Sequence, residues 1–253
     1  MALLLLILTP GIARSQGGPP FLTNDPGTPG NAHWEINLGS MQSIARSAAS
    51  YQVPQIDLNF GVGDRIQLTY EIPYVLQSSE GEARESGWGN GYTGVKWRFL
   101  DQGENGWQMS VFPQLETGGS ALARSEGLAV PGPRYFLPLE ITRQLGPLDV
   151  DFEAGYYLAG KATGERTLGL VAGRPVTERL ELDAEIYDDR GYGGSHSTTL
   201  DFGGRFKLRR GIIALFMAGC SVTGPGNAQA QFVGYIGVQV LLSDYGRTFT
   251  EQP

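Results

Sequence analysis

The residues best suited to chemistry in this sequence are charged side chains that recur at every second position. Two segments carry three acids each with this spacing, and these acids are Asp149, Asp151, Glu153, Glu181, Asp183 and Glu185. Alternate residues of a β-strand point to the same face of a sheet, so each trio is expected to line one face. A row of carboxylates inside a pore can orient a small solute.

Basic residues follow the same spacing. Arg205 and Lys207 lie in the segment after the second acidic trio, and antiparallel pairing predicts that Asp183 lies near Arg205. A second basic pair, Lys96 and Arg98, lies in a segment between two others that each carry an acid. These acids are Glu71 and Glu116. The simpler interpretation is that the acids and bases neutralise one another in the wall of a pore. The functional interpretation is that all twelve line a path for a solute, and both can hold together.

Motifs typical of enzymes and metal sites are weak. Residues 89–94 match the glycine pattern of a dinucleotide-binding turn, but they open a predicted strand rather than a helix, which predicts a loop. One cysteine, Cys220, and two histidines, His33 and His196, provide no disulfide framework and little for a zinc site. We therefore expect no catalytic residue, no cofactor and no metal.

A lipid-modifying enzyme is one alternative. The sequence Ser195-His196-Ser197 invites comparison with an outer-membrane phospholipase, which uses a His-x-Ser pair. That pair would need a serine at position 198, where this chain has Thr198. His196 is therefore interpreted as part of a loop.

The elements that must position the charged residues are short alternating segments. Apolar and polar residues alternate over 8–12 positions and then give way to a turn cluster, which is typical of β-strands. Residues 166–175 lack a clear apolar face, and 211–222 are apolar on both faces. No segment has a sustained helical period, so no helix is predicted after the N-terminal region. The predicted strands are 33–42, 52–62, 65–76, 92–101, 106–117, 134–144, 147–158, 166–175, 179–188, 199–208, 211–222 and 230–242.

The connections between these segments alternate strictly between long and short. Short periplasmic turns and longer extracellular loops are typical of transmembrane β-barrels, and an even number of strands places both termini on the periplasmic side. The glycine-rich connection 118–133 is long enough to fold inward as a plug. The long connections are 43–51, 77–91, 118–133, 159–165, 189–198 and 223–229.

The cost of charge in hydrocarbon decides which face meets lipid. Lys or Arg on the lipid side costs about 2–4 kcal/mol at the midplane, so the charged face is expected to line the lumen. An open sheet edge in lipid would leave backbone groups unpaired, so the sheet must close. A soluble ligand carrier with its apolar face inward is the alternative, but twelve strands exceed the eight of small soluble barrels. The aromatic residues that fit interfacial girdles are Trp34, Trp107, Tyr135 and Tyr70.

Residues 1–15 are interpreted as a secretory signal peptide. A short apolar run precedes Ala13-Arg14-Ser15, which predicts cleavage after Ser15. The run is too short to cross a bilayer as a helix, and no later stretch reaches 18 apolar residues. The predicted organisation is a periplasmic lead over 16–31, a barrel over 32–245 and a tail over 246–253. The net charge of −7 argues against nucleic acid as a partner.

Seven short motifs are concentrated in the first half of the chain. They are PPFLTNDP at 19–26, HWE at 33–35, PQIDLNFGV at 54–62, YEIPY at 70–74, GNG at 89–91, GVKWRF at 94–99 and FPQLETG at 112–118. These motifs resemble the MetA-pathway of phenol degradation family, whose members are described as outer-membrane transporters. The resemblance covers about residues 19–245 and is more specific in the first half. It implies an outer-membrane barrel linked to uptake of small, aromatic or hydrophobic compounds, with no catalytic residue.

Together these patterns predict an all-β, antiparallel up-and-down transmembrane barrel of about 12 strands in the outer membrane of a Gram-negative cell. The expected function is porin-like passive transport of small solutes. The expected partners are the outer-membrane bilayer, a small solute and the barrel assembly machinery. A non-conducting barrel that acts as a receptor through 77–91 and 118–133 is the main alternative.

Overall fold

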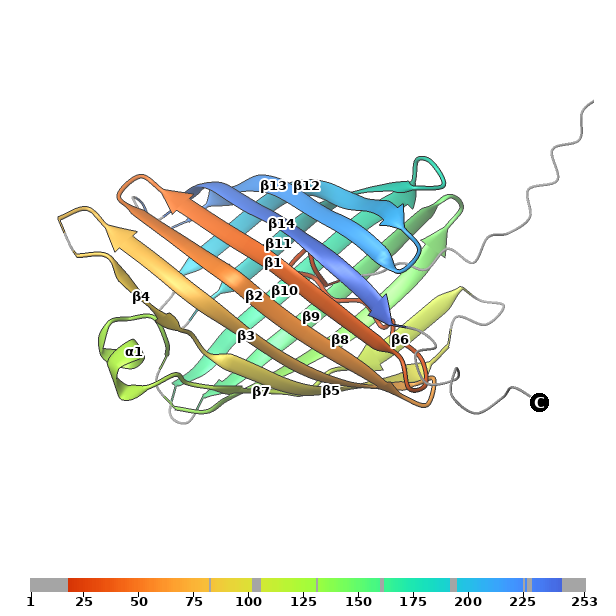
Figure 1. Cartoon of the computed structure of the whole chain (residues 1–253), viewed down its shortest axis with the longest axis horizontal. Helices are drawn as coiled ribbons and strands as arrows, with labels where there is room; N and C mark the ends of the chain where they lie inside the picture. The colour runs from red at the N-terminus through yellow and green to blue at the C-terminus, as the bar shows by residue number, and fades with distance from the viewer. Residues whose placement is uncertain are drawn as a thin grey trace, which may run out of the picture.

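The protein is a closed antiparallel β-barrel (Figure 1). The computed structural model describes residues 18–242 except 82, 102–105, 131, 160–161, 192–194, 225 and 227–228. Its strands are β1 (Trp34–Ala45), β2 (Ala48–Val62), β3 (Ile66–Ser79), β4 (Glu85–Trp88), β5 (Gly91–Leu100), β6 (Trp107–Val111), β7 (Gln114–Thr117), β8 (Arg134–Leu145), β9 (Leu148–Ala159), β10 (Ala162–Pro175), β11 (Leu180–Arg190), β12 (His196–Arg209), β13 (Ile212–Thr223) and β14 (Ala230–Leu242).

The pairing of these strands gives twelve positions around the barrel. Neighbours in sequence pair antiparallel, and β1 pairs with β14 to close the sheet. Both β4 and β5 pair with β3, while β6 and β7 both lie between β5 and β8, so each of these two pairs forms one interrupted strand. Pro113 lies in the second interruption, where its missing N–H cannot join the ladder. The prediction of a closed twelve-stranded barrel is confirmed.

The alternation in the sequence corresponds to the two faces of the wall. On β5, the side chain of Trp97 is 53% exposed on the outside, whereas Lys96 beside it is 4% exposed on the inside. The four predicted girdle residues, Trp34, Trp107, Tyr135 and Tyr70, are also exposed. Charged side chains therefore concentrate in the lumen, and large apolar side chains cover the outer surface.

One helix departs from the sequence-based expectation. Helix α1 (Ala121–Ser125) forms in the connection between β7 and β8, although no helix was predicted there. The Ser120 hydroxyl accepts a hydrogen bond from the Ala123 N–H at 3.0 Å, which caps the helix. Its single turn is too short to produce a helical period. Among the described residues, no helix has the length and apolar character needed to cross a membrane.

Several predicted boundaries fall outside the residues that the structure describes. The predicted signal peptide over 1–15, its cleavage site, and the tail over 246–253 all lie there. Within the described part of the chain, the strands extend further toward the long connections than predicted. For example, β2 begins at Ala48 rather than at position 52, and β12 begins at His196 rather than at 199. His196, which the sequence suggested to be a loop residue, is thus the first residue of a strand.

Candidate functional site in the barrel lumen

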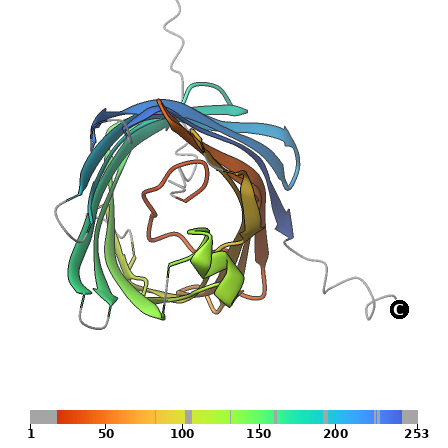
Figure 2. The same cartoon turned by 90° about the vertical axis from the view of Figure 1, so that its left-hand side faces the viewer.

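The chain before β1 enters the barrel. Residues 18–30, which we call the lead, lie inside the ring of strands (Figure 2). Phe21 is 4% exposed and Thr23 is fully buried. The sequence predicted a periplasmic lead over 16–31 but did not predict that it would fold into the lumen.

Two lumen acids hold the lead through its backbone. Glu185 on β11 accepts hydrogen bonds from the N–H groups of Leu22, at 3.2 Å, and Thr23, at 2.7 Å. Glu153 on β9 accepts from the backbone N–H of Asn24 at 3.1 Å and from its side-chain amide at 2.8 Å. Buried carboxylates need such donors, because an unsatisfied buried charge is costly.

Two lumen cations hold the lead through its carbonyl groups. Arg205 on β12 donates to the Pro19 carbonyl at 3.1 Å and to the Gly18 carbonyl at 3.3 Å. Lys96 on β5 donates to the Asp25 carbonyl. The lead therefore spans the lumen, with its contacts distributed from β5 to β12.

An apolar cluster anchors the tip of the lead. Phe21 packs in a buried cluster with Val171 of β10 and with the inward-facing side chains of β13 and β14. This explains why 211–222 is apolar on both faces, since the inner face of β13 covers Phe21 and the outer face is exposed. The other members of the cluster are Ile213, Leu215, Met217, Ala230, Val233 and Tyr235.

Two glycines leave room for the lead against the wall. A Cβ atom at Gly169 of β10 would lie 2.9 Å from the Cβ of Thr23, closer than side chains can pack. A Cβ at Gly61 of β2 would overlap the carbonyl of Gly30, at the point where the lead joins β1. The unclear pattern of 166–175 thus has a physical cause, because its inward positions accommodate the lead.

The connection 118–133 packs on the inner face of the wall at the opposite end. Ala123, Leu128 and Ala129 form a buried cluster with Val75, which points inward from β3. Seen from the end with the long connections, α1 lies at the rim of the ring (Figure 2). The expectation that this connection can fold inward agrees with this packing.

The ion pairs of the lumen agree only in part with those expected from the sequence. The Arg205 guanidinium lies 3.9 Å from the Asp183 carboxylate, the neighbour expected from the sequence, and 4.0 Å from that of Glu181, which is its direct cross-strand partner and was not predicted. Lys96 pairs instead with Glu140 of β8 at 3.2 Å. Glu116 pairs with Arg134 at 2.6 Å, a residue that the sequence analysis did not select.

The remaining predicted lining residues fall into two groups. Three lie in the lumen wall: Asp151 accepts from Thr142 at 2.5 Å, Glu71 accepts from Gln55 at 2.6 Å, and Asp149 is buried. The other two lie near the short turns. Arg98 pairs with Asp101 at 2.9 Å, and Lys207 is exposed near the end of β12.

The sequence analysis missed several buried lumen acids. Asp57, Glu140 and Asp201 are each at most 6% exposed. Each lies between two apolar residues in the alternating pattern, as in Leu139-Glu140-Ile141, so the same rule could have selected them. The lead offered no such signal, because its Pro- and Gly-rich sequence has no alternation.

Acids greatly outnumber bases in the buried interior. Among the described residues, ten acids but only two bases, Lys96 and Arg205, are buried. The interior is therefore strongly acidic even after the ion pairs form. No group of three or more His, Cys, Asp or Glu residues in the described part of the chain is arranged to hold a metal ion.

Comparisons with known proteins show which solved structures have a similar fold. No protein-family model matches the chain, and no curated protein matches it. The structure is similar to the COG4313 outer membrane channel from Pseudomonas putida F1, with a TM-score of 0.69 and 15% sequence identity over 86% of this chain and 98% of that chain. It is also similar to the KdgM porin (TM-score 0.53, 11% identity, 81% and 98% covered) and to the NanC porin (TM-score 0.51, 7% identity, 83% and 100% covered). At these identities the likeness concerns the fold, and the chain has the barrel fold of outer-membrane channels and porins.

Proposed function

We propose that the protein is an outer-membrane channel that passively admits small solutes, and that the lead constricts its path. The observation that carries this proposal is the closed barrel with an apolar outer surface, a charged lumen and a chain segment held across that lumen. The twelve lining residues predicted from the sequence, from Glu71 to Lys207, are proposed as parts of the wall that a solute meets. We also propose that the chain belongs to the MetA-pathway family, a proposal that the barrel fold and the sequence motifs support. The sequence of residues 1–15 supports export by a signal peptide that is cleaved after Ser15.

The acidic interior favours cationic or uncharged solutes over anions. An anion in the lumen would meet an excess of buried carboxylates, whereas a solute with amino, amide or hydroxyl donors could bind them. The lead itself illustrates this chemistry, because its N–H groups satisfy Glu153 and Glu185. The apolar inner face of β13 packs on Phe21, so it is open to small aromatic compounds, the class that the family resemblance implies, only when the lead is displaced.

Electrophysiology on the refolded protein tests this proposal. In a planar bilayer with a salt gradient, we expect discrete conductance steps and a zero-current potential of the sign for cation preference. The pair E153Q/E185Q should reduce that potential, whereas Glu80→Gln, at an exposed position beyond β3, should leave it unchanged. A folded barrel with neither conductance nor solute flux, with or without the lead, would overturn the channel proposal.

The receptor alternative predicts a different result. A non-conducting barrel would bind its partner through 77–91 and 118–133, so deleting these connections would abolish binding without changing permeability. The packing of Ala123, Leu128 and Ala129 on Val75 counts against this alternative, because it buries these three side chains and keeps them from contacting a partner.

The geometry around His196 does not favour a lipid-modifying enzyme. The same ring nitrogen, Nε2, lies 2.5 Å from an Asp188 oxygen and 3.3 Å from the Thr198 hydroxyl. A catalytic triad needs the acid on one ring nitrogen and the nucleophile on the other. We therefore propose that the protein is not an enzyme, and expect no lipid hydrolysis by the wild type or by His196→Ala.

A further inference from the structure

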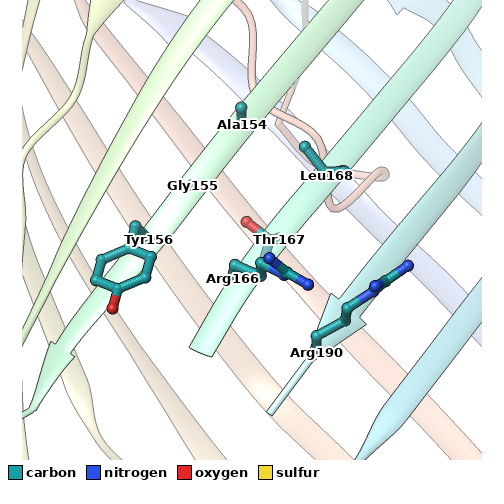
Figure 3. Close-up of a pocket in the computed structure, with 7 residues that line it drawn as sticks. All are labelled: Ala154, Gly155, Tyr156, Arg166, Thr167, Leu168 and Arg190. Carbon is teal, nitrogen blue, oxygen red and sulfur yellow. The ribbon is translucent and has the colours of Figure 1, made fainter. Parts of the chain in front are cut away.

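A pair of arginines lies on the outer face of the barrel, near the end with the long connections. Arg166 of β10 and Arg190 of β11 are direct partners across the two strands. Both are exposed, and they follow the same alternation as the exposed Leu168 and Ile186. Figure 3 shows the two guanidinium groups projecting from neighbouring strands, with Thr167 on the opposite face.

A bound anion would reduce the repulsion between these two like charges. Like charges directly opposite each other on antiparallel strands destabilise the sheet. Arg190 makes one contact with Asp188, at 2.9 Å, and Asp188 is shared with His196 and Thr198. Among the described residues, no ion pair joins Arg166 to an acid. The local charge is therefore positive on a surface that the strand pattern directs toward lipid.

The two arginines border a groove of about 480 Å³ in the outer surface (Figure 3). Its other lining residues are mostly apolar or aromatic, and they are Ala154, Gly155, Tyr156, Thr167 and Leu168. Tyr156 is the cross-strand partner of Arg166 on the other side of β10. The groove thus combines a cationic end with an apolar floor, which suits a ligand that has an anionic head and a hydrocarbon chain.

The position of the groove relative to the membrane decides which lipid it can meet. On β10, Arg166 and Arg174 share the outer face and are eight residues apart. This spacing corresponds to about 26 Å along the strand and, at a tilt of about 40°, to about 20 Å across the membrane. The two arginines therefore bracket a band close to the ~25 Å apolar height of outer-membrane barrels. Arg166 lies at the end with the long connections, which face the cell exterior in such barrels.

We propose that Arg166 and Arg190 bind a phosphate of a phosphorylated glycolipid in the outer leaflet, with an acyl chain lying along Ala154 and Leu168. Guanidinium groups bind phosphate through paired, charge-assisted hydrogen bonds. The occupant is a lipid rather than free phosphate, because the groove continues from the arginines onto the apolar face. This inference rests on the proposed outer-membrane location but not on conductance.

The test is native mass spectrometry of the refolded, full-length mature barrel titrated with diphosphorylated lipid A. The wild type should retain the lipid, and the double variant R166Q/R190Q should bind it about 25-fold more weakly, at about fivefold for each interfacial arginine. Arg174→Gln removes the same charge from the other end of β10 and should bind like the wild type. R166K/R190K, which keeps the charge but loses paired hydrogen bonding, should lie between the two.

Three results of these lipid-binding measurements would overturn the proposal. They are equal retention by R166Q/R190Q and wild type, an equal loss in Arg174→Gln, and equal binding of lipid A from which the phosphates have been removed. Complete displacement of lipid A by inorganic phosphate would show a free-phosphate site and would also overturn it. A heat-dependent gel shift of every variant establishes the folded barrel separately, so failure of this site is distinguishable from failure of the membrane proposal.

Discussion

Gly169 is the position where a single side chain would decide whether the lead fits. The strand there has space only for a hydrogen atom, because Thr23 lies against it. We predict that Gly169→Val displaces the lead and raises single-channel conductance, while the β-branched side chain keeps the strand intact. Ala184→Val introduces the same side chain on the exposed outer face of β11 and should leave conductance at the wild-type value. Equal conductance in all three proteins would contradict the proposed role of the lead.

Replacing Lys96 should strongly destabilise the folded barrel. Its ammonium pairs with the fully buried Glu140 and also holds the Asp25 carbonyl. Removing one partner of a buried ion pair typically costs about 3–5 kcal/mol, because the other charge is left unpaired. We therefore predict that Lys96→Met lowers the free energy of unfolding by about this amount, and that K96M/E140L recovers most of it. Urea unfolding in vesicles measures both, and a loss in the double variant equal to that in Lys96→Met would show that the pair is not the cause.

At the scale of residues, the alternation predicted which face of the sheet a side chain points to better than it predicted the residue with which that side chain forms an ion pair. It assigned Lys96 and Glu116 to the inward face, and both side chains are buried, because the side-chain period of a strand is a local property. It did not identify Glu140 or Arg134 as their partners, since that requires the register between strands and the depth of each side chain.

At the scale of elements, Phe21 should determine whether the lead stays docked. Fully burying a phenylalanine side chain contributes about 1.5–3 kcal/mol. We predict that Phe21→Ala shifts the lead toward an undocked state by roughly 10- to 150-fold, which limited proteolysis would detect as faster cleavage within 18–30. Leu22→Ala, at the next position but outside the buried cluster, is the matched control. Cleavage of both variants at the wild-type rate would show that the cluster does not hold the lead.

The elements themselves were predictable to different degrees. The strands followed from alternation and turn residues, and the two interruptions at 89–90 and 112–113 did not change the count of twelve. The position of the lead depends on contacts with β5 and with β9 to β13, which no local pattern records. The sequence reflected the position of the lead indirectly. The inner faces of two segments, 166–175 and 211–222, depart from the polar pattern of the other segments.

At the scale of the whole molecule, closure of the sheet should make the protein resistant to detergent. The ladder between β1 and β14 leaves no free edge where unfolding can begin. We predict that the protein appears in the outer-membrane fraction and migrates differently in SDS gels before and after boiling. Recovery in the soluble periplasmic fraction without such a shift would contradict the membrane proposal and favour a soluble ligand carrier.

The lead also sets an order of events during assembly. Its hydrogen bonds to Lys96, Glu153, Glu185 and Arg205 join residues separated by 71 to 187 positions, and its apolar anchor needs the inner face of β13. Contacts of such long range form only after the intervening chain is in place. The segment that leaves the ribosome early is therefore among the last to reach its final position, and the newly closed barrel passes through a stage in which its bore is still empty.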